Sequence, residues 1–99
     1  MDVSREIRKT VDTGKVFFGT EKTLKALRNG DAKLVIYTKN CPEKVKSDVR
    51  YYSELSKTPT YAFEGSALEL GTLCGKPFIV SVMTIISQGE SNILALEGT

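Results

Sequence analysis

The feature that most constrains the fold is an uninterrupted apolar run, Leu34-Val35-Ile36-Tyr37, bounded by polar residues. A strand with one face in water alternates apolar and polar side chains, whereas this run presents apolar side chains to both faces of a sheet. It therefore predicts a central strand covered on both sides. A longer β-like run, Phe78–Ile86, predicts a second strand.

Helical and extended patterns alternate along the rest of the chain. Val3, Ile7 and Val11 recur every fourth residue, which predicts a helix with Asp2 as its N-cap and Gly14 at its end. Further helices are expected after Gly19-Thr20, at Asn40-Cys41-Pro42 with Pro42 in the first helical position, from the capping box at Ser66–Glu69, and at Ser91–Leu96. Short strands are expected at Lys15–Phe18 and Thr60–Phe63.

The helix after Pro42 has a predicted apolar face made of Val45, Val49, Tyr52 and Leu55. Since helices and strands alternate, the expected architecture is an α/β fold, a three-layer α/β/α sandwich around four strands. There is no internal repeat or linker, so we expect a single domain over residues 1–99.

Basic residues are concentrated in the first half of the sequence. That half has 12 of the 14 lysines and arginines and a net charge of +5, whereas the second half has a net charge of −3. Cations on one face would attract phosphates, but lysines also solvate ordinary helices. Charge alone therefore leaves both alternatives open.

The sequence offers little for catalysis or metal binding. It has no histidine, and Cys41 and Cys74 are far apart, so neither a zinc site nor a nucleophile with a histidine base is supported. The Gly71–Pro77 segment fails as a P-loop, because its glycines are too close and Pro77 replaces the magnesium-binding Ser/Thr. We expect no enzymatic activity, cofactor or metal.

The sequence also lacks signals for membrane insertion or secretion. No apolar run approaches the roughly 20 residues that span a bilayer, and the charged start Met1–Glu6 has no apolar segment behind it. We therefore expect a cytosolic protein with reduced thiols and no membrane partner.

A candidate ligand site lies at the expected strand-to-helix junction, Gly19–Lys25. A helix N-terminus favours anions, and Gly19 allows close approach to the backbone. Lys22 and Lys25 share one helix face, and Glu21 can accept hydrogen bonds from a base edge. The alternative is an ordinary helix start with solvated lysines.

The second candidate segment is Gly75–Val80, between the fourth helix and the last strand. In an α/β fold this loop can lie beside the Gly19 turn and present Phe78 to an unpaired base. The alternative for Phe78 is burial in the core.

Together these segments resemble a known family. Gly19–Gly30, followed by Ala32–Ile36, is similar to the signature of the kink-turn-binding superfamily, and Tyr51-Tyr52, Glu69–Lys76 and Gly89–Leu94 resemble its thirty-e branch of ribosomal proteins. Glu21-Lys22 departs from the Asn-Glu of other branches, and Pro77 replaces a non-proline residue of some relatives.

The resemblance implies a mixed four-stranded sheet and binding to a kink-turn in ribosomal RNA of the large subunit, beside other ribosomal proteins, by a chain that is monomeric when free. The alternative is a kink-turn in another ribonucleoprotein, such as a guide RNA particle. By position, the implied RNA-binding residues are Gly19, Thr20, Glu21, Lys22, Lys25, Asn40, Lys76, Phe78 and Val80.

Overall fold

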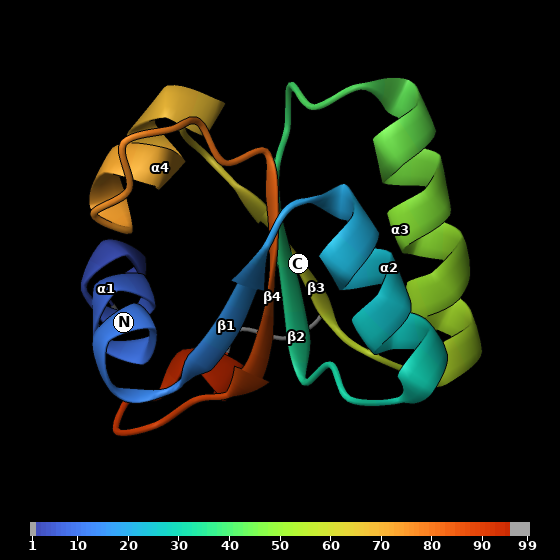
Figure 1. Cartoon of the computed structure of the whole chain (residues 1–99), viewed down its shortest axis with the longest axis horizontal. Helices are drawn as coiled ribbons and strands as arrows, with labels where there is room; N and C mark the ends of the chain where they lie inside the picture. The colour runs from blue at the N-terminus through green and yellow to red at the C-terminus, as the bar shows by residue number, and fades with distance from the viewer. Residues whose placement is uncertain (1, 96–99) are drawn as a thin grey trace.

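The computed structural model describes residues 2–95, which alternate between helices and strands as expected (Figure 1). The elements in chain order are α1 (Val3–Thr13), β1 (Lys15–Phe18), α2 (Thr20–Asn29), β2 (Leu34–Thr38), α3 (Glu43–Ser56), β3 (Thr60–Phe63), α4 (Ala67–Leu73), β4 (Val82–Ser87) and the 3-10 helix η1 (Ile93–Ala95).

The strands form one sheet in the order β1-β4-β2-β3. β2 and β3 are parallel, whereas β4 is antiparallel to both β1 and β2, so the sheet is mixed. Helices α1 and α4 cover one face of the sheet, and α2 and α3 cover the other (Figure 1). The predicted three-layer sandwich is confirmed.

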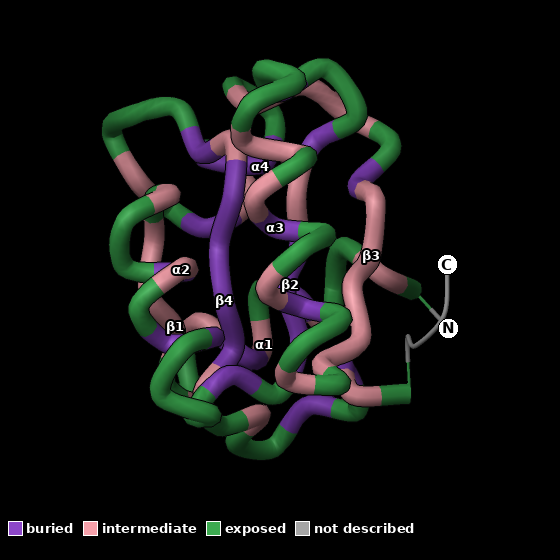
Figure 2. Tube along the Cα trace, turned by 90° about the vertical axis from the view of Figure 1, so that its right-hand side faces the viewer, coloured by how far each residue is buried: buried purple, intermediate pink, exposed green. Residues whose placement is uncertain are grey.

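Each face of the sheet has its own apolar core. Along β2, Leu34 and Ile36 pack on the side of α1 and α4, and Val35 packs on the side of α2 and α3. All three are fully buried, and the other central strand, β4, is also buried along most of its length (Figure 2). The central strand predicted from this apolar run is therefore confirmed.

The start of the last strand was predicted wrongly. β4 begins at Val82 and not at Phe78, and residues 78–81 form a loop. Both neighbours of β4 stop pairing with it at this point. The last pair with β1 is Phe18 and Met83, and the last pair with β2 is Tyr37 and Val82. A strand needs a partner for its backbone groups, so an apolar run beyond the partners does not remain in the sheet.

Two other boundaries and one buried position also differ from the prediction. Pro42 is the N-cap of α3 and not its first helical residue. The final helix is the short η1, and Leu96 lies outside the described residues. Leu55 is 66% exposed, because it lies about 120° around the helix from Val49 while Ser53 takes the inward position.

Among the described residues, no helix is both long and apolar enough to cross a membrane.

Candidate nucleic-acid interface

Three loops that are separate in sequence meet at one end of the sheet. The Gly19 amide donates to the Val82 carbonyl at 3.0 Å, and the Thr38 amide donates to the Ser81 carbonyl at 2.9 Å. These bonds hold the turn after β1 and the loop after β2 against the loop that precedes β4. The carboxyl ends of β1 and β2 and the start of β4 all lie at the upper end of the sheet in Figure 1.

The turn after β1 leaves the beginning of α2 open to ligands. Gly19 is exposed and has φ 102° and ψ 159°, a conformation that side-chain-bearing residues rarely adopt. As the N-cap it supplies no side-chain acceptor to the first turn of α2. The free amides and the positive end of the helix dipole therefore favour an anionic group here.

Cationic side chains surround this helix start. Lys22 and Lys25 are exposed, and so is Glu21, which directly precedes Lys22 in the first turn of α2. The Lys22 Nζ lies 6.0 Å from the centroid of the Phe17 ring, and the Lys15 Nζ lies 5.5 Å from it. Positive charge is thus held against an aromatic surface beside the turn.

The loop before β4 presents apolar side chains next to these cations. Phe78 is 51% exposed and Ile79 is 64% exposed, so burial of Phe78 in the core is not observed. With Gly19, Thr20, Lys22 and residues of β1, both side chains line a hollow of about 430 Å³. The hollow joins an open helix start to an apolar surface that suits an unpaired base.

Buried contacts with α4 and the core hold the loop in place. The Val80 amide donates to the Ala67 carbonyl at 3.0 Å, and the Val80 side chain, 3% exposed, packs in the core with α1 and α4. A Cβ at Gly71 would overlap the Phe78 carbonyl oxygen, so only glycine allows the loop to lie this close to α4. Val80 thus anchors the loop in the core, and it also lines the hollow.

The remaining predicted residues lie around the hollow. Lys76 is half-buried, with its Nζ 5.1 Å from the centroid of the Phe18 ring. Asn40 is exposed in the turn after β2 but does not line the hollow. Lys25 lines a neighbouring hollow with Phe17 and Lys22.

An ion pair lies beside Asn40. The Lys39 Nζ donates to the Glu64 Oε1 at 2.8 Å, and this hydrogen bond raises the pKa of Lys39. Because Glu64 offsets its charge, Lys39 adds no net positive charge at this end of the sheet.

Several residues of the hollow, Ile79 and Phe17 among them, were not predicted from the sequence. Ile79 fell in both the candidate loop Gly75–Val80 and the predicted strand Phe78–Ile86, and it was not named as a contact residue. Phe17 was predicted only as part of the short strand Lys15–Phe18, although its ring lies near the ammonium groups of Lys15 and Lys22. The missing signal was the lack of a strand partner at Ile79, which depends on contacts distant in sequence.

The cysteines lie away from the hollow. Cys41 and Cys74 are both free and buried. Burial raises the pKa of both thiols, that of Cys74 to about 11. Within residues 2–95, no three side chains of the His, Cys, Asp or Glu type are grouped so as to hold a metal.

Comparison with known proteins identifies the family. Residues 1–95 match the model of the ribosomal protein L7Ae/L30e/S12e/Gadd45 family. The chain is 50% identical to the large ribosomal subunit protein eL30 of Methanosphaera stadtmanae, over 98% of this chain and 99% of the relative. It is 46% identical to the eL30 of Methanothermobacter thermautotrophicus, over 99% and 100% of the two chains.

The fold also occurs in a solved structure of distant sequence. A protein of unknown function from Bacillus halodurans superimposes with a TM-score of 0.82 at 21% identity, covering 95% of this chain and 93% of that one. This likeness concerns the fold alone, whereas the eL30 relatives extend the resemblance to sequence over nearly the whole chain. The chain therefore belongs to the ribosomal protein L7Ae/L30e/S12e/Gadd45 family, in its eL30 branch.

Proposed function

We propose that this protein is a structural constituent of the large ribosomal subunit and that it binds a kink-turn in ribosomal RNA. The ribosomal part rests on the names of relatives that match it from end to end. The kink-turn part rests on the surface at the upper end of the sheet. Its single strongest support is the hollow in which the open start of α2 and the exposed Phe78 loop lie side by side.

The hollow suits a sharply bent RNA because different groups in and around it can contact the phosphates, the base edges and an unstacked base. Lys22, Lys25 and Lys76 provide cations for phosphates, which determine affinity and its salt dependence. Gly19 and Glu21 offer backbone and carboxylate groups to base edges at the bend. Phe78 and Ile79 provide an apolar surface for a base that leaves the stack.

The remaining parts of the proposal concern context. The protein acts without enzymatic activity, as one domain, and is monomeric when free. In the cell it lies in cytoplasmic ribosomes, in contact with ribosomal RNA and with neighbouring ribosomal proteins. Asn40 joins the interface from the loop after β2, next to the Lys39–Glu64 ion pair.

A gel-shift titration tests the RNA specificity. The chain is titrated against a kink-turn RNA and against the same RNA with its sheared G·A pairs replaced by Watson–Crick pairs. We expect much tighter binding to the kink-turn, since only that RNA presents the bend and the unstacked base. Equal affinity for both RNAs would refute specific recognition.

Sedimentation of native extracts tests the ribosomal assignment. We expect the protein in the fractions that contain large subunits. Its presence only in small free ribonucleoprotein particles would instead support a kink-turn in another RNA.

A further inference from the structure

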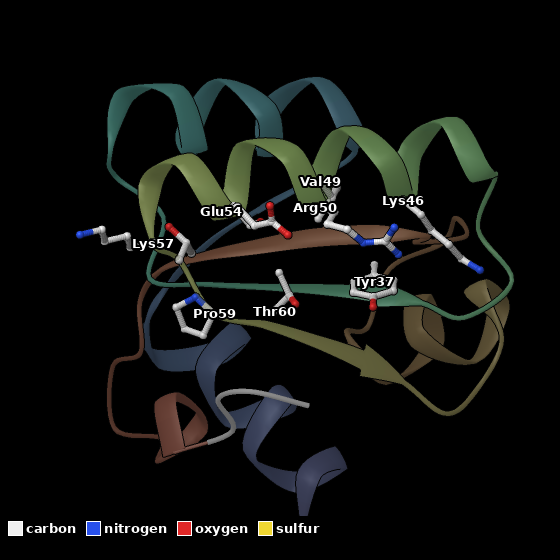
Figure 3. Close-up of a pocket in the computed structure, with 10 residues that line it drawn as sticks. Tyr37, Lys46, Val49, Arg50, Glu54, Lys57, Pro59 and Thr60 are labelled. Carbon is white, nitrogen blue, oxygen red and sulfur yellow. The ribbon is translucent and has the colours of Figure 1, made fainter.

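A second hollow, of about 500 Å³, lies on the other side of the molecule, between α3 and the strands β2 and β3. Figure 3 shows Arg50 and Glu54 extending from α3 toward the strands, above Tyr37 and Thr60. We call it the α3 groove. It shares no lining residue with the hollow at Gly19 and Phe78.

Three cations are distributed along the α3 groove. Lys46 and Lys57 lie toward its two ends, with Arg50 between them (Figure 3). Lys46 and Arg50 are one helical repeat apart, about 6 Å along the axis, and Lys46 and Lys57 are about 16 Å apart along it. A line of cations of this length suits an extended polyanion better than a single small anion.

The three cations that line the groove outnumber Glu54, the one carboxylate among its described lining residues. Lys46 pairs with Glu43 at 3.6 Å, whereas Arg50 and Lys57 form no ion pair among residues 2–95. Positive charge in the groove is therefore available for an external partner.

A buried hydroxyl also points to a ligand. Ser53 lines the α3 groove and is only 4% exposed, yet its Oγ has no hydrogen-bond partner within the described part of the chain. A buried polar atom without a partner is costly, and native proteins usually satisfy such atoms. A hydrogen-bonding group that enters the groove would satisfy this hydroxyl.

The backbone at Lys57 is unusual. Among residues 2–95, Lys57 is the only residue other than glycine with positive φ, at 56°, and it is the C-cap of α3. Glycine is the usual residue in this left-handed position because it has no Cβ penalty. A lysine here keeps a charge at the end of the groove at the expense of backbone stability.

We propose that the α3 groove binds the sugar-phosphate backbone of one RNA strand, at a second RNA contact separate from the kink-turn. Lys46, Arg50 and Lys57 contact phosphates spaced along the strand. Ser53 and Glu54 hydrogen-bond ribose 2′-hydroxyl groups, which donate to the Glu54 carboxylate. The carboxylate would repel a strand that offered phosphates alone, so it favours RNA over DNA.

The test uses NMR titration of the full chain, saturated with kink-turn RNA, against a uridylate dodecamer and a thymidylate dodecamer. We expect RNA to shift the amide resonances of residues around Arg50 and Ser53, and DNA to bind more weakly. Equal binding of DNA, an equal response to polyglutamate, or shifts confined to the Gly19 surface would each overturn the proposal.

Variants separate a binding role from a structural one. Arg50→Ala should lower the salt slope of dodecamer binding by about 0.7, the value for one phosphate contact on a single strand. Lys44→Ala, on α3 but outside the groove, is the matched control, since Lys44 pairs with Asp48 at 3.1 Å. An equal loss in both variants would refute a defined groove.

Two further variants should bind the RNA dodecamer more weakly without losing thermal stability. Ser53→Ala removes the hydroxyl without a partner, and Lys57→Gly relieves the left-handed strain, so both should keep or raise Tm and weaken dodecamer binding. Unchanged binding in both variants would overturn the proposal. Both variants should bind the kink-turn RNA with unchanged affinity. If the wild type failed to bind the kink-turn RNA but still bound the dodecamer at the groove, only the proposed function would be refuted.

Discussion

The rings of Phe18 and Phe78 meet edge to face, with centroids 6.3 Å apart and an interplanar angle of 79°. Phe18 ends β1, and Phe78 lies in the loop before β4, so this contact joins two segments distant in the chain. Only part of the Phe78 surface is used, because 51% of the residue remains exposed. Phe18 therefore positions Phe78 while leaving one side of it open to a ligand.

Replacing Phe78 with alanine should weaken kink-turn binding by roughly 1–3 kcal/mol, the usual loss for an aromatic side chain that stacks on a base. Tm should change little, because the side chain is half-exposed. Fluorescence anisotropy with labelled kink-turn RNA, together with thermal unfolding, measures both effects. Leu68→Ala, at an even more exposed apolar position on α4, is the control and should leave affinity unchanged. A lower Tm with unchanged affinity would show that Phe78 is only structural.

The layers of this fold were predictable because their signals are local. The apolar run of β2 is buried on both faces as predicted, since a strand between two helical layers has no polar face. The capping box is present in both directions, with the Glu69 amide donating to Ser66 Oγ at 3.1 Å and the Ser66 amide donating to Glu69 Oε1 at 3.2 Å. Such patterns depend only on residues close in sequence.

The site was only partly predictable because its geometry depends on distant contacts. The apolar residues at 78–81 leave the sheet where β1 and β2 end, which cannot be read from that segment alone. The same contacts expose Phe78 and Ile79 and bury Val80, so neighbouring apolar residues have opposite roles. The adjacency of the Gly19 turn and the loop was expected, and the hollow that Gly19, Phe78 and Ile79 line together confirms it.

Replacing Lys22 with alanine should reduce the salt dependence of kink-turn binding. If Lys22 contacts one phosphate, the slope of log K against log salt concentration should fall by about 1. Lys33→Ala is a matched control, because Lys33 is exposed at the opposite end of β2. Anisotropy titrations at several salt concentrations give both slopes. An unchanged slope for Lys22→Ala would exclude a phosphate contact by this side chain.

Replacing Gly71 with alanine should destabilise the fold and weaken RNA binding together. The new Cβ would overlap the Phe78 carbonyl oxygen, so the loop must move away from α4. Overpacking of this kind costs about 1–3 kcal/mol. Urea denaturation measures the stability, and kink-turn affinity reports the loop position. Thr72→Ala, at the next and exposed position of α4, should change neither quantity much. Full stability and affinity in Gly71→Ala would show that the loop tolerates displacement.

The pH dependence of stability should contain a contribution from the Cys74 thiol. Burial raises the pKa of Cys74 from 9.0 to about 11, so the folded state favours the neutral thiol. The stabilisation is fully present below about pH 9 and is lost as the pH rises toward 11, because the unfolded chain ionises first. At 1.36 kcal/mol per pKa unit, the loss is on the order of 2 kcal/mol.

Urea denaturation of the wild type and of Cys74→Val, at pH 8 and at pH 10.5 with reductant, isolates this contribution. Lysines and tyrosines titrate in both proteins, so only the difference between the two pH profiles reports on Cys74. We expect the wild type to lose more stability than the variant, whatever their absolute stabilities at pH 8. Parallel profiles would mean that the thiol, whose Sγ lies 3.9 Å from the Met83 Sδ in the core, ionises without cost to the fold.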